Sequence, residues 1–369
     1  MAKARRVILT GGGTGGHIYP ALAIGARVVQ RLAPVELLFV GSAGGMEESL
    51  VRSEGMDFVG LPVRGMIRKG AMDQVTGAAR FGLSLATALG VVHRFHPQVV
   101  VGTGGYAAGP MGIAAVVSGT PLLIQEQNVV PGVTNRWLSR FAAAVAVPLP
   151  EAARNFPPQA KLLIAGNPVR PELLVADRAA CRAALGLGST EPLVVMVAGS
   201  RGSAVFVRLL AEWLPQWERG TLLFVSGRAH AAAAQRVLDE MRDRPHGRVL
   251  LVPYAERMGD LLAASDLVVA RAGAMTLADL AGVGRPAILI PSPYVTHHHQ
   301  EANADAFAAA GGALVLPEAD LDGRRLGDEV AVLLADRVRL AEMGRRARSL
   351  YRADALDRIV RKIETLLRH

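Results

Sequence analysis

Short apolar runs alternate with longer segments of helical periodicity along the whole chain. Each run has three to five residues, which suits a buried strand, and turn-forming residues separate the runs from the helical segments. Because strands that alternate with helices need crossover connections, the pattern predicts an α/β fold with parallel sheets. The predicted strands span residues 7–9, 37–40, 58–62, 99–101, 122–124, 144–147 and 162–164 in the first half, and 193–197, 222–225, 249–252, 267–270, 287–290 and 313–316 in the second.

The pattern occurs twice, which predicts two Rossmann-like doubly wound parallel-sheet domains facing a cleft. The join is expected at Gly166 to Pro171, where glycine, asparagine and two prolines end one strand and delay the next helix. The expected domains span residues 1–165 and 166–349, with the helical tail 350–369 packing back on the first. Ligands of such folds bind beyond the carboxyl ends of the strands.

Composition and charge narrow the class of protein. The chain has 369 residues, of which 51% are hydrophobic and 20% are charged, as in a globular protein. The net charge of +9 is concentrated in residues 1–160, where 14 Lys and Arg face 8 Asp and Glu. This surplus favours an anionic partner, and scarce aromatic residues make nucleic acid the weakest candidate. Cys181 stands alone, so neither a disulfide nor a thiolate metal site is expected.

Apolar runs in this chain are short. None reaches the roughly 18–20 residues that a membrane-spanning helix needs. The basic start is followed by only a few apolar residues, which is too few for a signal peptide. We therefore expect a cytoplasmic protein.

A glycine-rich loop ending in histidine, TGGGTGGHIYP, follows the first predicted strand at residues 10–20. Its spacing fits the dinucleotide fingerprint, but the second strand ends in Gly41-Ser42, and its acid, Glu36, lies at the wrong end to hold a ribose. A P-loop is also excluded, because His17 stands where lysine is needed. The loop predicts an anion-binding turn that presents the imidazole of His17 as a general base.

A second glycine loop follows the strand at residues 99–101. Two such loops on neighbouring parallel strands favour a diphosphate site built from backbone N–H groups. The candidate residues for this site are Gly13, Gly104, Gly105 and Tyr106. The alternative is that both loops are tight turns that begin helices.

A polar cluster, QEQN at residues 125–128, ends the next predicted strand. Such a position on an open parallel sheet indicates a binding site, although capping of the next helix is the alternative. Glu126 is expected to orient or assist His17, or to bind a sugar hydroxyl.

Loops of the second half offer further candidates. Ser200, in the loop GSRGS, precedes a helix whose N-terminus could stabilise a departing diphosphate, and a helix-capping role for Ser200 or Ser203 is compatible with that. The segment RAGAMTLAD could wrap a nucleoside, with its last residue, Asp279, binding the ribose hydroxyls. His297 to His299 lack a carboxylate spaced to complete a metal site, so no metal is expected. Hydrogen bonding by Gln300 and Asn303 is favoured instead.

The segment from Gln74 to Gln125 contains no acidic residue, and residues 75–92 within it are apolar around most of a helix. Such a helix is typical of docking on anionic lipid, and the alternative is a helix packed against the sheet. The candidate residues for membrane contact are Phe81, Leu85, Arg80 and Arg94.

Ordered motifs in both halves resemble the MurG family of bacterial cell-wall N-acetylglucosaminyltransferases, which convert lipid I to lipid II. The matching motifs are GGTGGHIYP at 12–20, GTGGY at 102–106, EQN at 126–128, GNPVR at 166–170, Gly199-Ser200, RAGAMT at 271–276, and His299-Gln300 with Asn303. The resemblance implies a two-domain glycosyltransferase B fold. It also implies UDP-N-acetylglucosamine (UDP-GlcNAc) as donor, held mainly by the second domain, and undecaprenyl-diphosphate-linked MurNAc-pentapeptide (lipid I) as acceptor.

The resemblance also implies individual donor contacts. These residues are Thr14, Gly15, Gly16, Asn128, Arg170, Ser200, Ala255, Ala274, Met275, Thr276, Leu277, Ala278, Asp279, Gln300 and Asn303. Among them Ala255 would lie against uracil, and the residues of the first half would reach the donor sugar. The chain departs from the family at Asp279, where Glu is usual, at Gln125, where His is usual, and at Arg201, where Gln is common.

The implied reaction is an inverting transfer without metal or cofactor. His17, helped by Glu126, would deprotonate the MurNAc 4-hydroxyl, and Ser200, its helix N-terminus and Arg170 would stabilise UDP. The expected partners are UDP-GlcNAc, lipid I, an anionic membrane surface on the cytoplasmic side of the cell membrane, and other cell-wall synthesis proteins, but not nucleic acid. Two alternatives stay open, a UDP-GlcNAc 2-epimerase of the same fold and a noncatalytic module that binds UDP-sugar or lipid.

Overall fold

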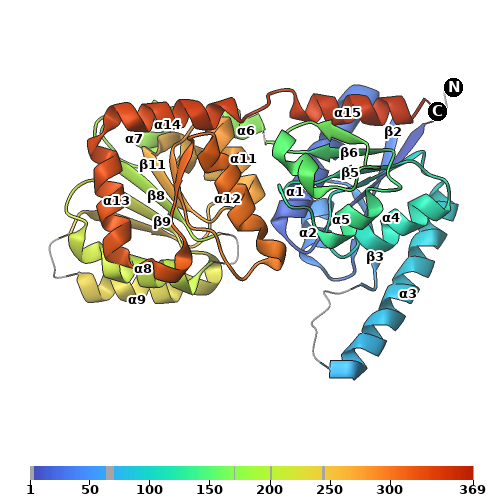
Figure 1. The fold of residues 1–369 in the computed structure, drawn as a ribbon, viewed down its shortest axis with the longest axis horizontal. Coiled ribbons are helices and arrows are strands. Elements are labelled where there is room, and N and C mark those ends of the chain that lie inside the picture. Colours follow the sequence, from blue (N-terminus) through green and yellow to red (C-terminus); the bar gives the residue numbers. More distant parts are fainter. Residues whose placement is uncertain (1–3, 64–69, 170, 200–201, 243–245, 369) are drawn as a thin grey trace. The chain divides into compact units, whose positions relative to one another are not determined.

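The computed structural model describes residues 4–63, 70–169, 171–199, 202–242 and 246–368. The chain divides into two compact units, each with its own parallel sheet (Figure 1). Unit 1 comprises Met1–Pro168 together with Arg352–His369, and unit 2 comprises Val169–Tyr351. The division falls between Pro168 and Val169, within the expected join and three residues beyond the expected boundary after residue 165, and the chain returns to unit 1 at Arg352. The sequence candidates Arg170, Ser200 and Arg201 lie outside the described residues.

Unit 1 is built on a seven-stranded sheet in the described part of the chain, with strand order β3-β2-β1-β4-β5-β6-β7. Its strands are β1 (Arg5–Thr10), β2 (Val35–Ser42), β3 (Asp57–Leu61), β4 (Val99–Gly102), β5 (Leu122–Gln125), β6 (Ala144–Val147) and β7 (Leu162–Ile164). Its α-helices are α1 (Gly15–Leu32), α2 (Met46–Ser53), α3 (Gly70–Phe95), α4 (Ala108–Val117), α5 (Val133–Leu138) and α15 (Ala355–Leu366). All pairs are parallel, and the order reverses between β1 and β4.

Unit 2 is built on a six-stranded sheet in its described residues, with strand order β10-β9-β8-β11-β12-β13. Its strands are β8 (Leu193–Val197), β9 (Thr221–Val225), β10 (Arg248–Val252), β11 (Leu267–Ala270), β12 (Ala287–Leu289) and β13 (Ala313–Val315). Its α-helices are α6 (Pro171–Leu174), α7 (Arg178–Ala184), α8 (Ala204–Trp213), α9 (Ala231–Met241), α10 (Met258–Ala264), α11 (Ala274–Val283), α12 (His299–Ala309), α13 (Gly323–Ala335) and α14 (Arg337–Ser349). The order of this sheet reverses between β8 and β11.

The predicted fold class, two doubly wound parallel-sheet units, is confirmed, and each predicted strand is found within two residues of its expected bounds. The strands were recognisable because helices cover both faces of each sheet. In β1, Val7 and Leu9 face a core with α1 and α15, whereas Ile8 faces a core with α3 and α4. A strand buried on both faces must be apolar at every position, which gives the continuous apolar runs.

The C-terminal helix α15 lies against α1 in unit 1 (Figure 1). Ile359, Val360 and Ile363 are fully buried in the same core as β1. At the rim of this contact, Arg27 of α1 donates to Asp357 Oδ1 over 2.7 Å. The end of the chain therefore completes one face of the first sheet.

Candidate active site

Two glycine loops meet in unit 1 where the strand order reverses, the position at which open parallel sheets bind ligands. The first loop follows β1 and the second follows β4, its immediate neighbour. Gly12 N donates to Gly104 O over 3.2 Å, and Thr103 N donates to Thr10 O over 2.8 Å. The two predicted loops therefore form one hydrogen-bonded structure.

Only glycine fits the closest approaches of the two loops. A Cβ atom at Gly105 would lie 2.1 Å from Gly12 O, and Gly105 also has a φ of +86°. A Cβ atom at Gly11 would lie 2.1 Å from the Thr103 hydroxyl oxygen. These approaches explain the glycines without any ligand, so they support the loop geometry and leave the diphosphate role as a proposal.

His17 stands in the first turn of α1 and is half-buried. Its Nδ1 lies 3.1 Å from Gly12 O and 3.4 Å from Thr14 Oγ1. A carbonyl oxygen only accepts, so this contact assigns the proton of a neutral imidazole to Nδ1 and the lone pair to Nε2. Thr103 Oγ1 donates to the backbone oxygen of His17 over 2.7 Å, so hydrogen bonds fix both the backbone and the ring of this residue.

The second loop lies beside the Nε2 side of the ring. A Cβ atom at Gly104 would be 3.1 Å from Nε2 of His17. The exposed ring of Tyr106 lies next to the first loop, 3.5 Å from the Cβ position of Gly13. The imidazole therefore stands among the residues expected to hold the acceptor.

A buried acid that the sequence reading missed, Glu47 of α2, lies against the first glycine loop. Its carboxylate accepts from Ser42 N at Oε1 over 2.8 Å and from Gly13 N at Oε2 over 3.2 Å. The side chain is 1% exposed. An acid does therefore reach the carboxyl end of β2, from the following helix rather than from the strand, and it binds the protein's own backbone.

This contact changes the expectation for Gly13. Its N–H group was expected to donate to a diphosphate, but it already donates to Glu47. Gly12 N is likewise engaged by the second loop. In the described structure these two amides are not available to a phosphate.

Glu126 organises the loop that follows β5. Its Oε1 accepts from the backbone N and side-chain Nδ2 of Asn128, both over 2.9 Å. Its Oε2 accepts from Gly132 N over 3.2 Å and from Asn135 Nδ2 over 2.9 Å. Four hydrogen bonds to this buried carboxylate show that Glu126 organises the loop, and its expected help to His17 or to a sugar hydroxyl stays a prediction.

The side-chain amides of Gln125 and Gln127 connect this loop to Asn167 and to the second glycine loop. Gln125 Nε2 donates to Asn167 Oδ1 over 3.1 Å, and Asn167 Nδ2 donates to Gln127 O over 2.9 Å. Gln127 Nε2 also donates to Thr103 O over 2.9 Å. The motifs QEQN and GNP, far apart in the sequence, thus form one buried network with the second glycine loop.

Two helices of unit 2, α8 and α11, follow the strands between which its strand order reverses. Ser203 lies at the N-terminus of α8, and Gly273 lies at the N-terminus of α11. Arg271 joins them, because its Nη2 donates to Ser203 Oγ over 2.9 Å. Arg271 also donates to Ile290 O, pairs with Glu318, and stacks on the ring of Phe206.

The expected nucleoside segment forms the first turns of α11. Ala274, Met275 and Thr276 begin the helix, whereas Leu277 is buried in the core and can offer a ligand only its backbone. Asp279 is also buried, and Ala278 packs against the same core. The side chains of this segment therefore divide between the end of the helix and the interior.

The other candidates of unit 2 lie in the loop after β10, at the edge of the sheet, and on α12. Ala255 is half-buried in the loop after β10. Gln300 Oε1 accepts from Ser292 N over 2.9 Å, and Asn303 Nδ2 donates to Ala272 O over 3.2 Å. Asn303 thus fixes the loop before α11.

Among the described residues, no group of three or more His, Cys, Asp or Glu side chains is placed to hold a metal ion. His297 and His298 have φ values of +58° and +50°. Burial and then the charge of Asp260 raise the pKa of the Cys181 thiol.

The predicted membrane helix is α3, whose described side chains include exposed Arg80, Phe81, Leu83 and Arg94, with Leu85 half-buried. Phe81 and Thr134 of α5 both border Gly109 of α4, within 3.8 Å and 3.5 Å of its Cβ position. In the described parts of the chain, no helix is long and apolar enough to span a bilayer.

A further group of exposed apolar and basic side chains lies on α5 and directly after it, outside the segment that the sequence singled out. Trp137 and Phe141 are 47% and 53% exposed, and their ring centroids lie 5.3 Å apart. Exposed Arg136 and Arg140 flank them. We call Phe81, Leu83, Trp137 and Phe141 with the exposed arginines 80, 94, 136 and 140 the basic apolar face.

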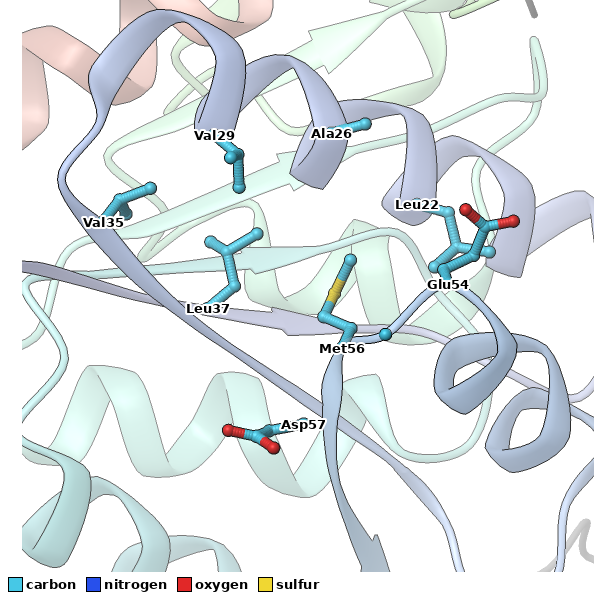
Figure 2. Close-up of a pocket in the computed structure, with 9 residues that line it drawn as sticks. Leu22, Ala26, Val29, Val35, Leu37, Glu54, Met56 and Asp57 are labelled. Carbon is cyan, nitrogen blue, oxygen red and sulfur yellow. The ribbon is translucent and has the colours of Figure 1, made fainter.

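A pocket of about 480 Å³ lies elsewhere in unit 1, between α1 and the starts of β2 and β3 (Figure 2). Its lining includes the apolar side chains of Leu22, Val35 and Met56 and the carboxylates of Glu54 and Asp57. Val35 and Asp57 begin their strands, whereas the glycine loops follow the opposite strand ends. The pocket shares no residue with the glycine loops and is not the candidate site.

Comparisons with known proteins agree with the division of the chain into two units. The glycosyltransferase family 28 N-terminal domain matches residues 7–147, and the family's C-terminal domain matches residues 193–359. A relative from Moorella thermoacetica is 41% identical over 97% of this chain and 98% of its own length. That relative is named UDP-N-acetylglucosamine–N-acetylmuramyl-(pentapeptide) pyrophosphoryl-undecaprenol N-acetylglucosamine transferase.

Solved structures are similar over the whole chain. The crystal structure of MurG from Acinetobacter baumannii matches with a TM-score of 0.79 and 26% identity, over 98% of this chain and 99% of that one. A UDP-GlcNAc 2-epimerase from Neisseria meningitidis matches with a TM-score of 0.69 and 13% identity, over 99% of this chain and 100% of that one, which shows a shared fold alone. The expected resemblance is confirmed: this chain belongs to glycosyltransferase family 28 and, within it, to the MurG family of N-acetylglucosaminyltransferases.

Proposed function

We propose that this chain transfers GlcNAc from UDP-GlcNAc to the 4-hydroxyl of MurNAc in lipid I, giving lipid II and UDP. The relative that is 41% identical over nearly its full length is named for a transferase of this kind, which supports the same reaction here. The low identity of the epimerase structure gives that alternative no support beyond the fold.

The observation that carries the chemistry is the hydrogen bond between His17 Nδ1 and Gly12 O. It leaves the lone pair of the neutral ring on Nε2, as a general base requires. In an inverting displacement, Nε2 takes the proton of the MurNAc 4-hydroxyl while its oxygen bonds to C1 of the donor sugar. The bond from C1 to the phosphate oxygen breaks, and its electron pair leaves with UDP.

Departure of UDP needs positive potential in unit 2. The N-termini of α8 and α11 stand at the reversal of its strand order, and each offers backbone N–H groups and a favourable helix dipole to an anion. We assign the diphosphate to the loop before α8, which includes Ser200, with Arg170 as a further contact. The nucleoside is assigned to α11 with Ala255, Asp279, Gln300 and Asn303. These groups make a divalent cation unnecessary.

The acceptor is assigned to unit 1. Because Gly13 N already donates to Glu47, the acceptor diphosphate is assigned to the second loop, with Gly104, Gly105 and Tyr106. Thr14, Gly15, Gly16 and Asn128 stay assigned to the donor sugar. Glu126 acts on this site by holding Asn128.

The basic apolar face is assigned to the cytoplasmic surface of the cell membrane. Exposed aromatic and aliphatic side chains can enter the headgroup region, while arginines beside them attract anionic lipid. An enzyme whose acceptor is lipid-linked needs such contact, and other cell-wall synthesis proteins are further candidate partners.

A transfer assay with UDP-GlcNAc and a lipid I analogue tests the proposal. His17→Ala should lower kcat by about 10²–10⁴-fold with little change in the KM for UDP-GlcNAc, because only proton transfer is lost. EDTA should leave the activity unchanged. Near-normal turnover by His17→Ala would remove the base assignment, and loss of activity in EDTA would remove the metal-free one.

Two controls separate the alternative functions. Incubation with UDP-GlcNAc alone should leave the sugar unchanged, and formation of the manno isomer would favour the epimerase. Binding of UDP-GlcNAc without turnover in the presence of lipid I would favour the noncatalytic module.

A further inference from the structure

We propose that Glu47 is a positioning residue for His17 and acts on the imidazole through the Gly12–Gly13 peptide group. The inference rests on the proposed role of His17 as the base, although the contact itself does not. Glu47 lies 30 residues from His17 in the sequence and on a different helix.

A single peptide group joins the two side chains. Its N–H, from Gly13, donates to Glu47 Oε2 over 3.2 Å. Its C=O, from Gly12, accepts from His17 Nδ1 over 3.1 Å. The carboxylate, the peptide and the imidazole therefore form a continuous chain of two hydrogen bonds.

Three glycines make room for the Glu47 side chain. Cβ atoms at Gly12, Gly41 and Gly45 would lie 2.3, 2.7 and 2.7 Å from its atoms, closer than van der Waals contact allows. These glycines come from the first loop, the end of β2 and the turn before α2. The carboxylate is thus enclosed at the carboxyl end of β2, where its other oxygen, Oε1, accepts from Ser42 N.

The chain of hydrogen bonds has two consequences for His17. A carboxylate that accepts from a peptide N–H polarises the peptide and makes its carbonyl oxygen a stronger acceptor. A stronger acceptor at Gly12 O keeps the proton on Nδ1, and it favours the imidazolium that forms when Nε2 takes a second proton. Glu47 thereby does for His17 what a carboxylate in direct contact does in other acid–base sites.

Two other groups of the site are less suited to this role. Glu126 is the other buried acid of the site, but its oxygens accept from Asn128, Gly132 and Asn135. Thr14 Oγ1 lies 3.4 Å from Nδ1, farther than Gly12 O, and carries no charge. The Gly12–Gly13 peptide is therefore the described route from an acid to Nδ1.

The test compares Glu47→Gln with Glu48→Gln. A glutamine at position 47 keeps the size but offers one acceptor oxygen where the carboxylate offers two. Glu48 is the matched control, since it lies on the same helix and bonds Gly44 N and Arg52, away from the first loop. The readouts are the ¹⁵N chemical shifts of the His17 ring, which identify its tautomer, and the kinetics of transfer.

We expect Glu47→Gln to raise the share of the Nε2–H tautomer and to lower kcat about 10- to 100-fold, within the ~10²–10⁴ that general base catalysis supplies. The KM for UDP-GlcNAc should stay within about twofold, and Glu48→Gln should match the native protein. The proposal is overturned if the His17 tautomer and kcat of Glu47→Gln equal those of Glu48→Gln. A purely structural role would instead weaken folding and substrate binding together and leave the tautomer unchanged.

A measurement on the native protein avoids any loss of folding in the variant. The chemical shift of the Gly13 amide proton should move downfield as His17 is protonated, with the same midpoint. The reason is that His17 bonds the C=O of the same peptide group whose N–H belongs to Gly13. A Gly13 signal that ignores the titration of His17 would overturn the proposal. If the signals move together but His17→Ala keeps its turnover, the coupling stands and the base assignment fails, so the two failures are distinguishable.

Discussion

Asn135 Nδ2 donates to Glu126 Oε2 over 2.9 Å, and both side chains are almost wholly buried. The bond joins the first turn of α5 to the end of β5. A buried carboxylate is tolerated only where hydrogen bonds replace water, so each of its four donors contributes to the stability of this loop.

Removal of this donor should destabilise the chain. Asn135→Ala should lower the free energy of unfolding by about 1–3 kcal/mol, the cost of an unsatisfied buried acceptor. Asn135→Asp should cost more, because it places a second carboxylate against Glu126. Urea unfolding at neutral pH measures both variants, and equal losses would contradict the account of Glu126 as a buried anion.

The pair Arg271 and Glu318 gives a second prediction, in unit 2. Their side chains are 12% and 8% exposed, so each charge depends on the other. Arg271→Ala should destabilise the protein by about 3–5 kcal/mol, because it leaves Glu318 unpaired in the interior. It should also raise the KM for UDP-GlcNAc, since Arg271 holds Ser203 beside the proposed diphosphate loop.

A double-mutant cycle separates the ion pair from the other contacts of Arg271. Glu318→Gln removes the charge that Arg271→Ala would strand, so the double variant should lose less stability than the two single losses together. The KM effect should persist in the double variant, because Ser203 still lacks its donor. Strict additivity of the unfolding energies would show that the pair is not coupled.

The elements that the sequence predicted well are those with local causes. Strands such as Val99–Gly102 and Ala144–Val147 are buried on both faces and read as unbroken apolar runs. The glycine loops were recognisable because positive φ values at Gly104 and Gly105 demand that residue. The side-by-side placement of the two loops followed from the rule that ligand loops gather where strand order reverses.

What the sequence did not predict depends on contacts between distant segments. The residues of β2 itself offer no acid at its carboxyl end. The turn after β2 folds back and brings Glu47 of α2 to Ser42 and Gly13. The sequence likewise does not show that Asn128, Gly132 and Asn135 converge on the carboxylate of Glu126. Side-chain partners of this kind follow from tertiary packing.

The missed half of the basic apolar face had a signal in the sequence. In the sequence the acid-free segment ends at Gln125 because Glu126 follows, yet Glu126 is buried and adds no charge to the surface. Without it the acid-free stretch continues to Pro150 and includes Trp137 and Phe141. A charged residue that the fold buries, such as Glu126, does not contribute to the charge of the surface.

The basic apolar face should bind anionic vesicles through its aromatic residues. Trp137→Ser combined with Phe141→Ser should weaken binding to phosphatidylglycerol vesicles by roughly tenfold or more, because burial of large apolar side chains drives insertion. Val338→Ser, at an 81% exposed site of unit 2, is the control and should bind as the native protein does. Vesicle sedimentation measures both, and equal binding by all three proteins would contradict the assignment.

The arginines of this face predict a dependence on salt and lipid charge. Attraction between exposed arginines and anionic lipid is screened over about 8–10 Å at physiological salt, so 0.5 M NaCl should weaken binding further. Vesicles of phosphatidylcholine alone should bind weakly at any salt concentration. Binding that ignores both variables would indicate a purely apolar contact.

Helix α15 allows two kinds of contact to be compared in one place. Asp357 pairs with Arg27 at the rim, where both side chains are about one-third exposed, whereas Ile359 is fully buried beneath it. Exposed ion pairs contribute about 0–1 kcal/mol, and truncation of a buried isoleucine costs about 2–5 kcal/mol. We therefore expect Ile359→Ala to lower the unfolding free energy several times more than Asp357→Asn, with the small effect of Asp357→Asn vanishing in high salt. If urea unfolding ranks the two variants the other way, α15 is held by its charges, and the burial of its apolar face would not explain why the chain end returns to unit 1.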